Sequence, residues 1–175
     1  MSASPIPVPF TQEEIADLER LLLRLKENNG FWPSEKTMRL AHNCIPHPAT
    51  ELVILRDGPK DPQILLAVYS DAVEKFKGLW HIPGGYMKWG AGLQDSCNRI
   101  AQRELNMDVT YVYTIDAYQW KPEEHLYGSP VSIYAYCEVL GKVIESETLK
   151  WFSLKALPEN MVEPHRNFVQ ATLRR

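Results

Sequence analysis

The sequence predicts an α+β domain in which a mixed β-sheet is sandwiched between helices, preceded by an N-terminal helical segment. Three observations support this prediction. Two runs rich in Val, Ile and Leu, at 51–56 and 63–69, are separated by Asp-Gly-Pro and Asp-Pro turn signals and indicate a β-hairpin. A glycine-rich loop then leads into a segment at 93–105 with helical periodicity. Strand-like segments follow that helix, and this mixture of strands and helices is typical of the α+β class.

The length and charge of the chain limit the number of domains and the kinds of partner that we expect. At 175 residues it is long enough for one well-buried core and short for two domains. The net charge of -3 is spread without long single-sign runs, so no nucleic-acid partner is expected. The first ten residues lack the basic and apolar regions of a secretion signal, and no apolar stretch approaches the ~20 residues of a membrane span. We therefore expect a cytoplasmic protein with no membrane partner.

Residues 1–47 are predicted to form an N-terminal extension with a helix at 12–28. Thr11 and Glu14 match the T-x-x-E capping box that starts a helix, and Asn29-Gly30 ends it. Behind the cap, apolar residues recur at helical spacing: Ile15, Leu18, Leu22 and Leu25. A second short helix is expected at 34–42. The wide apolar face of the first helix must be covered either by the domain or by a second subunit, as in a homodimer.

Residues 48–175 are predicted to form the folded domain. After the hairpin, the segment 79–82 leads into Pro83-Gly84-Gly85, and the helix at 93–105 carries an apolar stripe of Leu93, Cys97, Ala101 and Leu105. Strands are expected at about 111–120, 131–140 and 151–154, and a terminal helix at 164–173. The three cysteines are odd in number and lack metal-type spacing, so they are expected to be buried, reduced thiols.

The loop before the 93–105 helix is the first candidate for a functional site. Gly84 and Gly85 let the backbone approach a ligand closely, and Gly90 and Gly92 keep the following loop near the chain. A glycine loop that runs into a helix can present backbone N–H groups and a positive helix end to phosphate. Such a loop is by itself a weak signal, because most glycine loops are only turns.

Residues 78–109 resemble the box of the Nudix hydrolase family, G-x5-E-x7-R-E-U-x-E-E-x-G-U, in which U is a bulky apolar residue. An ungapped overlay places the box glycine at Gly85, the arginine at Arg99 and the last glutamate at Glu104. The closing G-U falls on Asn106-Met107, and Asn tolerates the left-handed conformation that follows a helix. The flanks GLWHIPGG and ETLKWFSLKALP also match the family. The resemblance implies a Nudix-type fold over about 48–173.

The box is degenerate in this chain. Ala91, Ile100 and Arg103 stand where the family has glutamates. In ordinary Nudix enzymes these carboxylates hold Mg²⁺, which neutralises a diphosphate and activates water. Glu104, the carboxylate that remains, cannot bind several ions. It could bind one ion if substrate oxygens, a carbonyl and a neutral side chain completed the shell.

One subfamily, the GDP-mannose mannosyl hydrolases, is similar at this point: its R-L-T-M-A-E-L-G resembles R-I-A-Q-R-E-L-N at 99–106. The resemblance implies attack at the sugar carbon of a nucleotide sugar. It also implies one Mg²⁺ or Mn²⁺ ion held by Glu104, the carbonyl of Gly85 and Gln119. Three departures stand against this match. Trp120 replaces the general-base histidine of the subfamily, and Tyr86 replaces its arginine after the two glycines. The subfamily's arginine in the strand before the box has no counterpart, because residues 65–70 include no charged residue.

His125 is the leading candidate for the missing catalytic base. Histidine titrates near neutrality, and this one lies in a polar loop between two predicted strands. Glu123 and Glu124, in the same loop, are its rivals.

Tyr86 and Arg99 are the candidates for substrate contact. Two other roles stay open for Arg99. It could form an i,i+4 surface pair with Asp95, or it could orient a box glutamate as the matching arginine does in the family.

Two hypotheses of different classes follow. The first is a metal-dependent Nudix hydrolase of a small-molecule nucleotide, with a nucleotide sugar such as GDP-mannose as substrate; retained Glu104 favours it. The second is a catalytically inactive Nudix-fold domain that binds a nucleotide or a protein partner; Ala91, Ile100 and Arg103 favour it.

Overall fold

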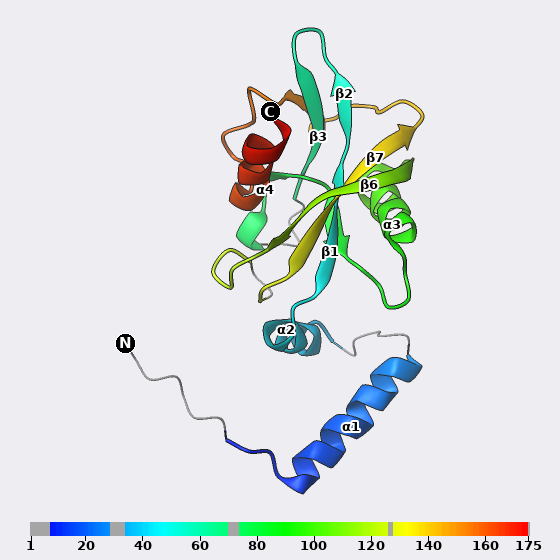
Figure 1. Cartoon of the computed structure of the whole chain (residues 1–175), viewed down its shortest axis with the longest axis vertical. Coiled ribbons are helices and arrows are strands. Elements are labelled where there is room, and N and C mark those ends of the chain that lie inside the picture. The colour runs from blue at the N-terminus through cyan, green and yellow to red at the C-terminus, as the bar shows by residue number, and fades with distance from the viewer. Residues whose placement is uncertain (1–7, 29–33, 70–73, 126–127, 175) are drawn as a thin grey trace, which may run out of the picture. The chain divides into compact units, whose positions relative to one another are not determined.

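The computed structural model describes residues 8–28, 34–69, 74–125 and 128–174. The chain forms two compact units, Met1–Met38 and Arg39–Arg175. Their boundary falls within helix α2 (Glu35–Cys44), which is close to the helix predicted at 34–42. Each unit is described by itself below (Figure 1). No helix in the described ranges is both long and apolar enough to cross a membrane.

The first unit contains helix α1 (Gln12–Glu27), which agrees with the predicted helix at 12–28. Its capping box is formed: the Glu14 N–H donates to Thr11 Oγ1 over 3.2 Å, and Glu14 Oε2 accepts from the Thr11 N–H over 2.8 Å. The predicted stop at 29–30 lies outside the described residues. No α1 residue is buried, and Leu18 and Leu22 are about half exposed.

The second unit contains two four-stranded sheets. The first has the order β5-β1-β7-β6, formed by β1 (Pro48–Val53), β5 (Gly84–Tyr86), β6 (Asp108–Gln119) and β7 (Val131–Leu140). It is mixed, because β1 runs parallel to β7 and antiparallel to β5, while β6 and β7 are antiparallel. In the second sheet β3 (Pro62–Val68) pairs antiparallel with β2 (Leu55–Asp57), β4 (Trp80–His81) and β8 (Leu149–Ser153).

The run at 51–56 was predicted to be one arm of a hairpin, and this is only partly right. The hairpin is formed by β2 and β3, whereas residues before Ile54 belong to β1 in the other sheet. The two segments differ in burial: β1 is buried on both faces after its first residue, whereas Arg56 and Asp57 of β2 are exposed. A continuous apolar run cannot show by itself where the chain passes from one sheet to the next.

Helices cover the sheets on opposite sides, as Figure 1 shows for α3 (Leu93–Leu105) and α4 (Glu163–Phe168). Beneath α3 a core cluster includes Leu52, Leu65, Cys97, Ile100 and Ala101; a second cluster, with α4, includes Val53, Ile64, Leu66, Tyr134 and Phe168. Successive residues of a strand point to opposite faces, so β1 and β3 supply both clusters. The predicted α+β sandwich is therefore confirmed.

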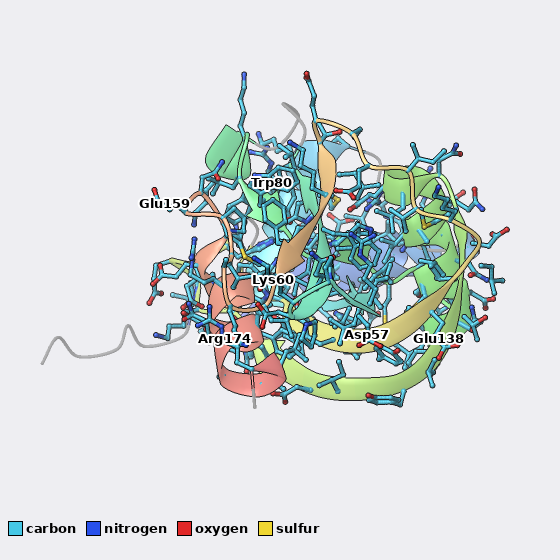
Figure 2. All side chains as sticks on the ribbon, turned by 90° about the horizontal axis from the view of Figure 1, so that it is seen from above. Asp57, Lys60, Trp80, Glu138, Glu159 and Arg174 are labelled. Atoms are coloured by element: carbon cyan, nitrogen blue, oxygen red, sulfur yellow. The ribbon has the colours of Figure 1, made fainter. Side chains whose placement is uncertain are left out.

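The ends of the helices also agree with the sequence. Asn106 follows α3 with φ of 52°, in the left-handed region. The terminal helix predicted at 164–173 is α4 continued by a π-helical turn at Val169–Leu173. The cysteines are free, and Cys97 and Cys137 are buried as predicted, but Cys44 is exposed. Figure 2 shows Trp80 within the domain and the exposed carboxylates Glu138 and Glu159 at its edge.

Candidate functional site

A cavity of about 500 Å³ opens beside Gly84 and Gly85, the first two residues of strand β5. Strands β1, β3 and β5, the end of α3 and the segment after β6 contribute to its wall. Its polar lining consists of Glu51, Tyr69, His81, Tyr86, Arg103, Glu104, His125, Ser132 and Thr148. The cavity thus brings together residues that are up to about a hundred positions apart in the chain.

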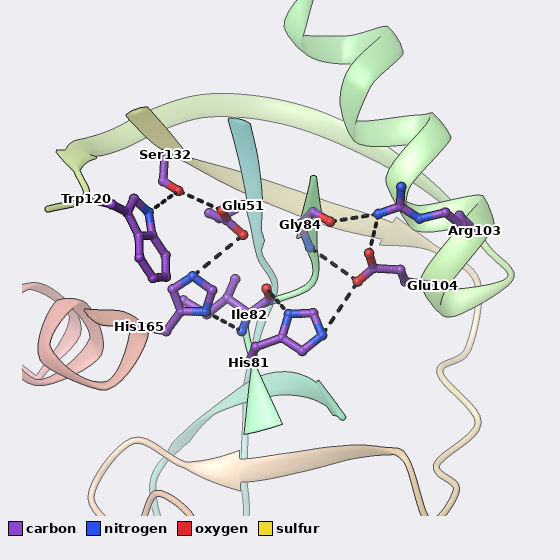
Figure 3. A network of polar contacts seen from close by, with 9 residues as sticks. All are labelled: Glu51, His81, Ile82, Gly84, Arg103, Glu104, Trp120, Ser132 and His165. Carbon is purple, nitrogen blue, oxygen red and sulfur yellow. Dashed lines mark hydrogen bonds and ion pairs between the residues drawn. The ribbon is translucent and has the colours of Figure 1, made fainter. Parts of the chain in front are cut away.

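Glu104 lies in the last turn of α3 and points at Gly84 of strand β5 (Figure 3). Its Oε2 accepts from the Gly84 N–H over 3.3 Å and is 3.9 Å from His81 Nε2. Its Oε1 forms an ion pair with Arg103. Burial raises the pKa of Glu104, while the hydrogen bond and charge of Arg103 act against that rise. Glu104 therefore sits where the resemblance predicts, beside the two glycines.

Arg103 binds Glu104, which is one of the predicted metal ligands, and the backbone beside the predicted carbonyl ligand. Its Nη2 donates to the carbonyl oxygen of Gly84 over 2.8 Å and to Glu104 Oε1. A Cβ atom added at Gly85 would lie 2.8 Å from the same Nη2, so the guanidinium packs directly on this residue. A carboxylate and a backbone carbonyl that would ligate an ion are thus both bound to an arginine.

Glu51 is a buried carboxylate at the floor of the cavity. It lies opposite Gly84 in the β1–β5 pairing, and a Cβ at Gly84 would come within 1.7 Å of its Oε2. Ser132 Oγ donates to Glu51 Oε1 over 2.7 Å, and Trp120 Nε1 donates to Ser132 Oγ over 2.8 Å. Burial, helped by the charge of Glu104, raises the pKa of Glu51 to about 8. At neutral pH this carboxyl is therefore mostly protonated.

Two buried histidines complete the network in Figure 3. The Ile82 N–H donates to His165 Nδ1 over 3.1 Å, so the proton of His165 is on Nε2, which lies 3.8 Å from Glu51 Oε2. His81 Nδ1 donates to the Ile82 carbonyl over 2.8 Å, which leaves a lone pair on Nε2, facing Glu104. Burial lowers the pKa of His81 to about 4 and that of His165 well below its usual range. Both rings are neutral at pH 7.

The predicted metal ligands are not brought together. Gln119 is exposed and its side-chain amide donates to Ser129 Oγ over 3.4 Å, outside the cavity wall. The next residue, Trp120, is the one that is buried at this position. Gly85, whose carbonyl was the predicted ligand, is paired with Thr50 of β1. The carbonyl that Arg103 binds belongs to Gly84, one residue earlier.

Arg99 is a positioning residue for the loop after the glycines. Its Nη2 donates to the Tyr86 carbonyl over 2.6 Å, and the side chain does not line the cavity. The structure therefore does not place it for the substrate contact predicted from the sequence. Tyr86 does line the cavity, at the end of β5.

His125 lines the cavity from the loop after β6. Its ring centroid is 5.1 Å from Trp120 and 6.2 Å from Tyr86, both edge-on. The rival Glu124 is turned into its own loop, where Oε2 accepts from Tyr118 Oη and from the Lys121 N–H over 2.8 Å each. Of the three candidate bases, His125 is the one that lies in the wall.

Glu51 and His165 were missed by the sequence analysis. Glu51 offered a signal: it is an acidic residue at the head of a Val/Ile/Leu run, where a carboxylate is rarely buried unless it has partners. His165 offered none, because its partners Glu51 and Ile82 are distant in sequence and meet it only in the tertiary structure.

The residues present do not fit a divalent ion. Mg²⁺ takes oxygen ligands in octahedral geometry, with one or two carboxylates from the protein. In the described parts of the chain no three His, Cys, Asp or Glu side chains are grouped to hold a metal. The oxygens nearest to such a site, on Glu104 and Gly84, already accept from Arg103. An ion would have to displace that guanidinium.

Comparison with known proteins identifies the family. The NUDIX domain model matches residues 46–172. The chain therefore belongs to the Nudix family. Gly85, Arg103 and Glu104 lie in its Nudix box, and Gly84 directly precedes it. No match was found among curated proteins.

Solved structures show the same fold. A MutT NUDIX hydrolase from Burkholderia pseudomallei is 23% identical with a TM-score of 0.60, over 72% of this chain and 97% of that one. A UDP-X diphosphatase is 16% identical with a TM-score of 0.56, over 94% of this chain and 85% of that one. The NUDIX domain of Shewanella oneidensis NrtR, complexed with ADP ribose, is 15% identical with a TM-score of 0.55, over 74% and 87%.

Proposed function

We propose that this Nudix domain hydrolyses a nucleoside diphosphate-linked small molecule, with a nucleotide sugar such as GDP-mannose as the first candidate. The observation that carries the proposal is the cavity at the Nudix box, which combines a pair of glycines, a cation and a titratable base in one wall. Its volume of about 500 Å³ lies in the range of small-molecule sites. The structural neighbours include a UDP-X diphosphatase and a domain complexed with ADP ribose.

The charges in the wall suit a diphosphate. Arg103 is half exposed to the cavity and can donate to phosphate oxygens, while Glu104 fixes its position. Glu51 carries little negative charge at neutral pH because its pKa is about 8. A diphosphate bound beside Arg103 would thus contact this arginine, the carboxylate of Glu104 that is paired with it, and the neutral ring of His81.

We infer attack at the anomeric carbon of the sugar, because the described residues include no cluster of ligands for the several metal ions that stabilise attack at phosphorus. A water oxygen bonds to that carbon, the bond from carbon to phosphate oxygen breaks, and its electron pair leaves on the diphosphate. His125 accepts the proton of the water. Trp120 cannot be the base, because its ring nitrogen donates to Ser132. The products are a nucleoside diphosphate and the free sugar.

Phosphate release coupled to a phosphatase, over a panel of nucleotide sugars and dinucleotides, tests this function. The assay is run with Mg²⁺, with Mn²⁺ and with EDTA. When the reaction is run in ¹⁸O-water, the label is expected in the sugar. In a separate kinetic assay, His125→Gln is expected to lower kcat about 100-fold or more. Glu123→Gln, an exposed carboxylate of the same loop outside the cavity wall, is the matched control. Label in phosphate would show attack at phosphorus instead.

A nucleotide-binding domain without turnover is the second candidate. It is favoured by Arg103, which fills the space between Glu104 and the Gly84 carbonyl. Calorimetric titration of the same panel separates the two candidates: binding without product release on every compound selects the second.

A further inference from the structure

We infer that Arg103 takes the place of the divalent ion in this Nudix domain, so that diphosphate binding depends on an arginine supplied by the fold and not on a metal. The inference deepens the proposed function, on which it rests for the ligand class. It concerns binding, however, so it can be tested whether or not the chain turns over a substrate.

The position of Arg103 in the box is the first argument. It stands where the family has the first of two adjacent glutamates. The change exchanges a metal-binding negative charge for a positive charge on the same turn of α3. The neighbouring Glu104 is kept, and its Oε1 is paired with the new cation. One substitution therefore removes a ligand and supplies a cation at the same place.

The geometry of the guanidinium is the second argument. Glu104 and the Gly84 carbonyl both accept from Nη2, on one side of the group. Among the described residues no partner binds Nη1 or Nε, and the side chain is 53% exposed and lines the cavity. A guanidinium presents five N–H donors in a fixed plane and carries a full positive charge. With Nη2 bound to Glu104 and Gly84, the two N–H groups of Nη1 and the one of Nε can each donate singly to a phosphate oxygen.

The start of strand β5 is the third argument. A Cβ at Gly85 would lie 2.8 Å from Nη2 and 3.4 Å from Nη1, so a side chain there would push the guanidinium out of its present position. Ser132 and the β1–β5 pairing hold the buried Glu51 on the other side of these glycines. Gly84, Gly85 and Glu104 thus hold the guanidinium of Arg103 in one position without an ion.

Calorimetric titration of the whole chain with inorganic diphosphate and with ADP tests the inference. Each titration is made in EDTA and repeated with Mg²⁺ in excess. We expect binding in EDTA, with a Kd within about threefold of that in Mg²⁺. Arg103→Gln is expected to weaken binding in EDTA about 10–100-fold, as the loss of a charge-assisted hydrogen bond does. Arg103→Lys is expected to retain part of the affinity.

A reverse substitution gives a second readout. Arg103→Glu restores the paired glutamates and is expected to bind Mn²⁺, detected by loss of the free-ion EPR signal, where the wild type does not. Its diphosphate binding should then require the metal. Lys142→Glu makes the same change of charge at an exposed residue after β7 and should behave like the wild type. Melting temperatures establish that each variant is folded.

The outcomes are distinct. Diphosphate binding by the wild type only when Mg²⁺ is present would overturn the inference, and so would equal affinities of the wild type and Arg103→Gln. Absence of diphosphate binding under both conditions would also overturn it. Metal-free, Arg103-dependent binding without turnover would leave the inference standing and remove the proposed hydrolysis.

Discussion

Replacing the buried Glu51 by Gln should make the domain more resistant to rising pH. The amide keeps the size of the side chain and the oxygen that accepts from Ser132. It replaces the other oxygen by an amide nitrogen, which cannot ionise. In the wild type burial raises the pKa of Glu51 from the ordinary 4.5 to about 8, so this carboxyl holds its proton more tightly when folded than when unfolded. Its contribution to stability is complete below pH 4.5 and is lost as the pH rises to about 8.

The size of the effect follows from the two pKa values. A tenfold difference in proton affinity is worth about 1.4 kcal/mol. Between pH 5 and pH 8 the ionisation of Glu51 should lower the free energy of unfolding by on the order of 3 kcal/mol. For a domain of this size that is roughly 6–12 °C in Tm. His81 and His165 act in the opposite direction, because their pKa values are lowered by burial. Their effect is common to both proteins and cancels in the difference.

Urea unfolding of the wild type and Glu51→Gln at several pH values between 5 and 8 measures this difference. The variant should gain stability relative to the wild type at each step upward. Glu138→Gln, at an exposed carboxylate of β7, is the control and should follow the wild type. Parallel curves for Glu51→Gln and the wild type would refute the reasoning, because they would mean that Glu51 ionises as easily in the fold as in the unfolded chain.

Three further substitutions test the packing around the site. Gly84→Ala would place a Cβ 1.7 Å from Glu51 Oε2 and should lower Tm strongly. Gly92→Ala should be tolerated, because its Cβ would meet its nearest neighbour at 3.9 Å. Equal losses of Tm in the two variants would contradict the close approach of Gly84 to Glu51. Asn106→Ala should destabilise by about 1 kcal/mol and Asn106→Gly should not, because the residue has a φ of 52°; thermal melts distinguish them. Ile100→Glu restores a box glutamate at a fully buried position. It should lower the free energy of unfolding, measured in urea, by about 3 kcal/mol or more, and it should not create Mn²⁺ binding. A stable variant that binds Mn²⁺ would argue against the burial of this position.

Local patterns in the sequence were sufficient for much of this fold. The helix α3, its apolar stripe and its left-handed end at Asn106 follow from side-chain periodicity and from the conformational preference of one residue. The capping box of α1 is likewise a relation between residues three apart. The ungapped overlay of the box predicted Glu104 near Gly85, and in the structure Glu104 Oε2 accepts from the N–H of the adjacent Gly84.

The tertiary structure decided the chemistry of the site. Whether Gln119 or Trp120 faces the cavity depends on the register of β6 against β7, since successive residues of a strand point to opposite faces. The burial of Glu51 depends on the pairing of β1 with β5 and on Ser132 from β7. The sequence by itself determined that Arg103 replaces a metal-binding glutamate. Only the fold determined that its guanidinium lies between Glu104 and the Gly84 carbonyl, because three separate segments must meet to bind it there.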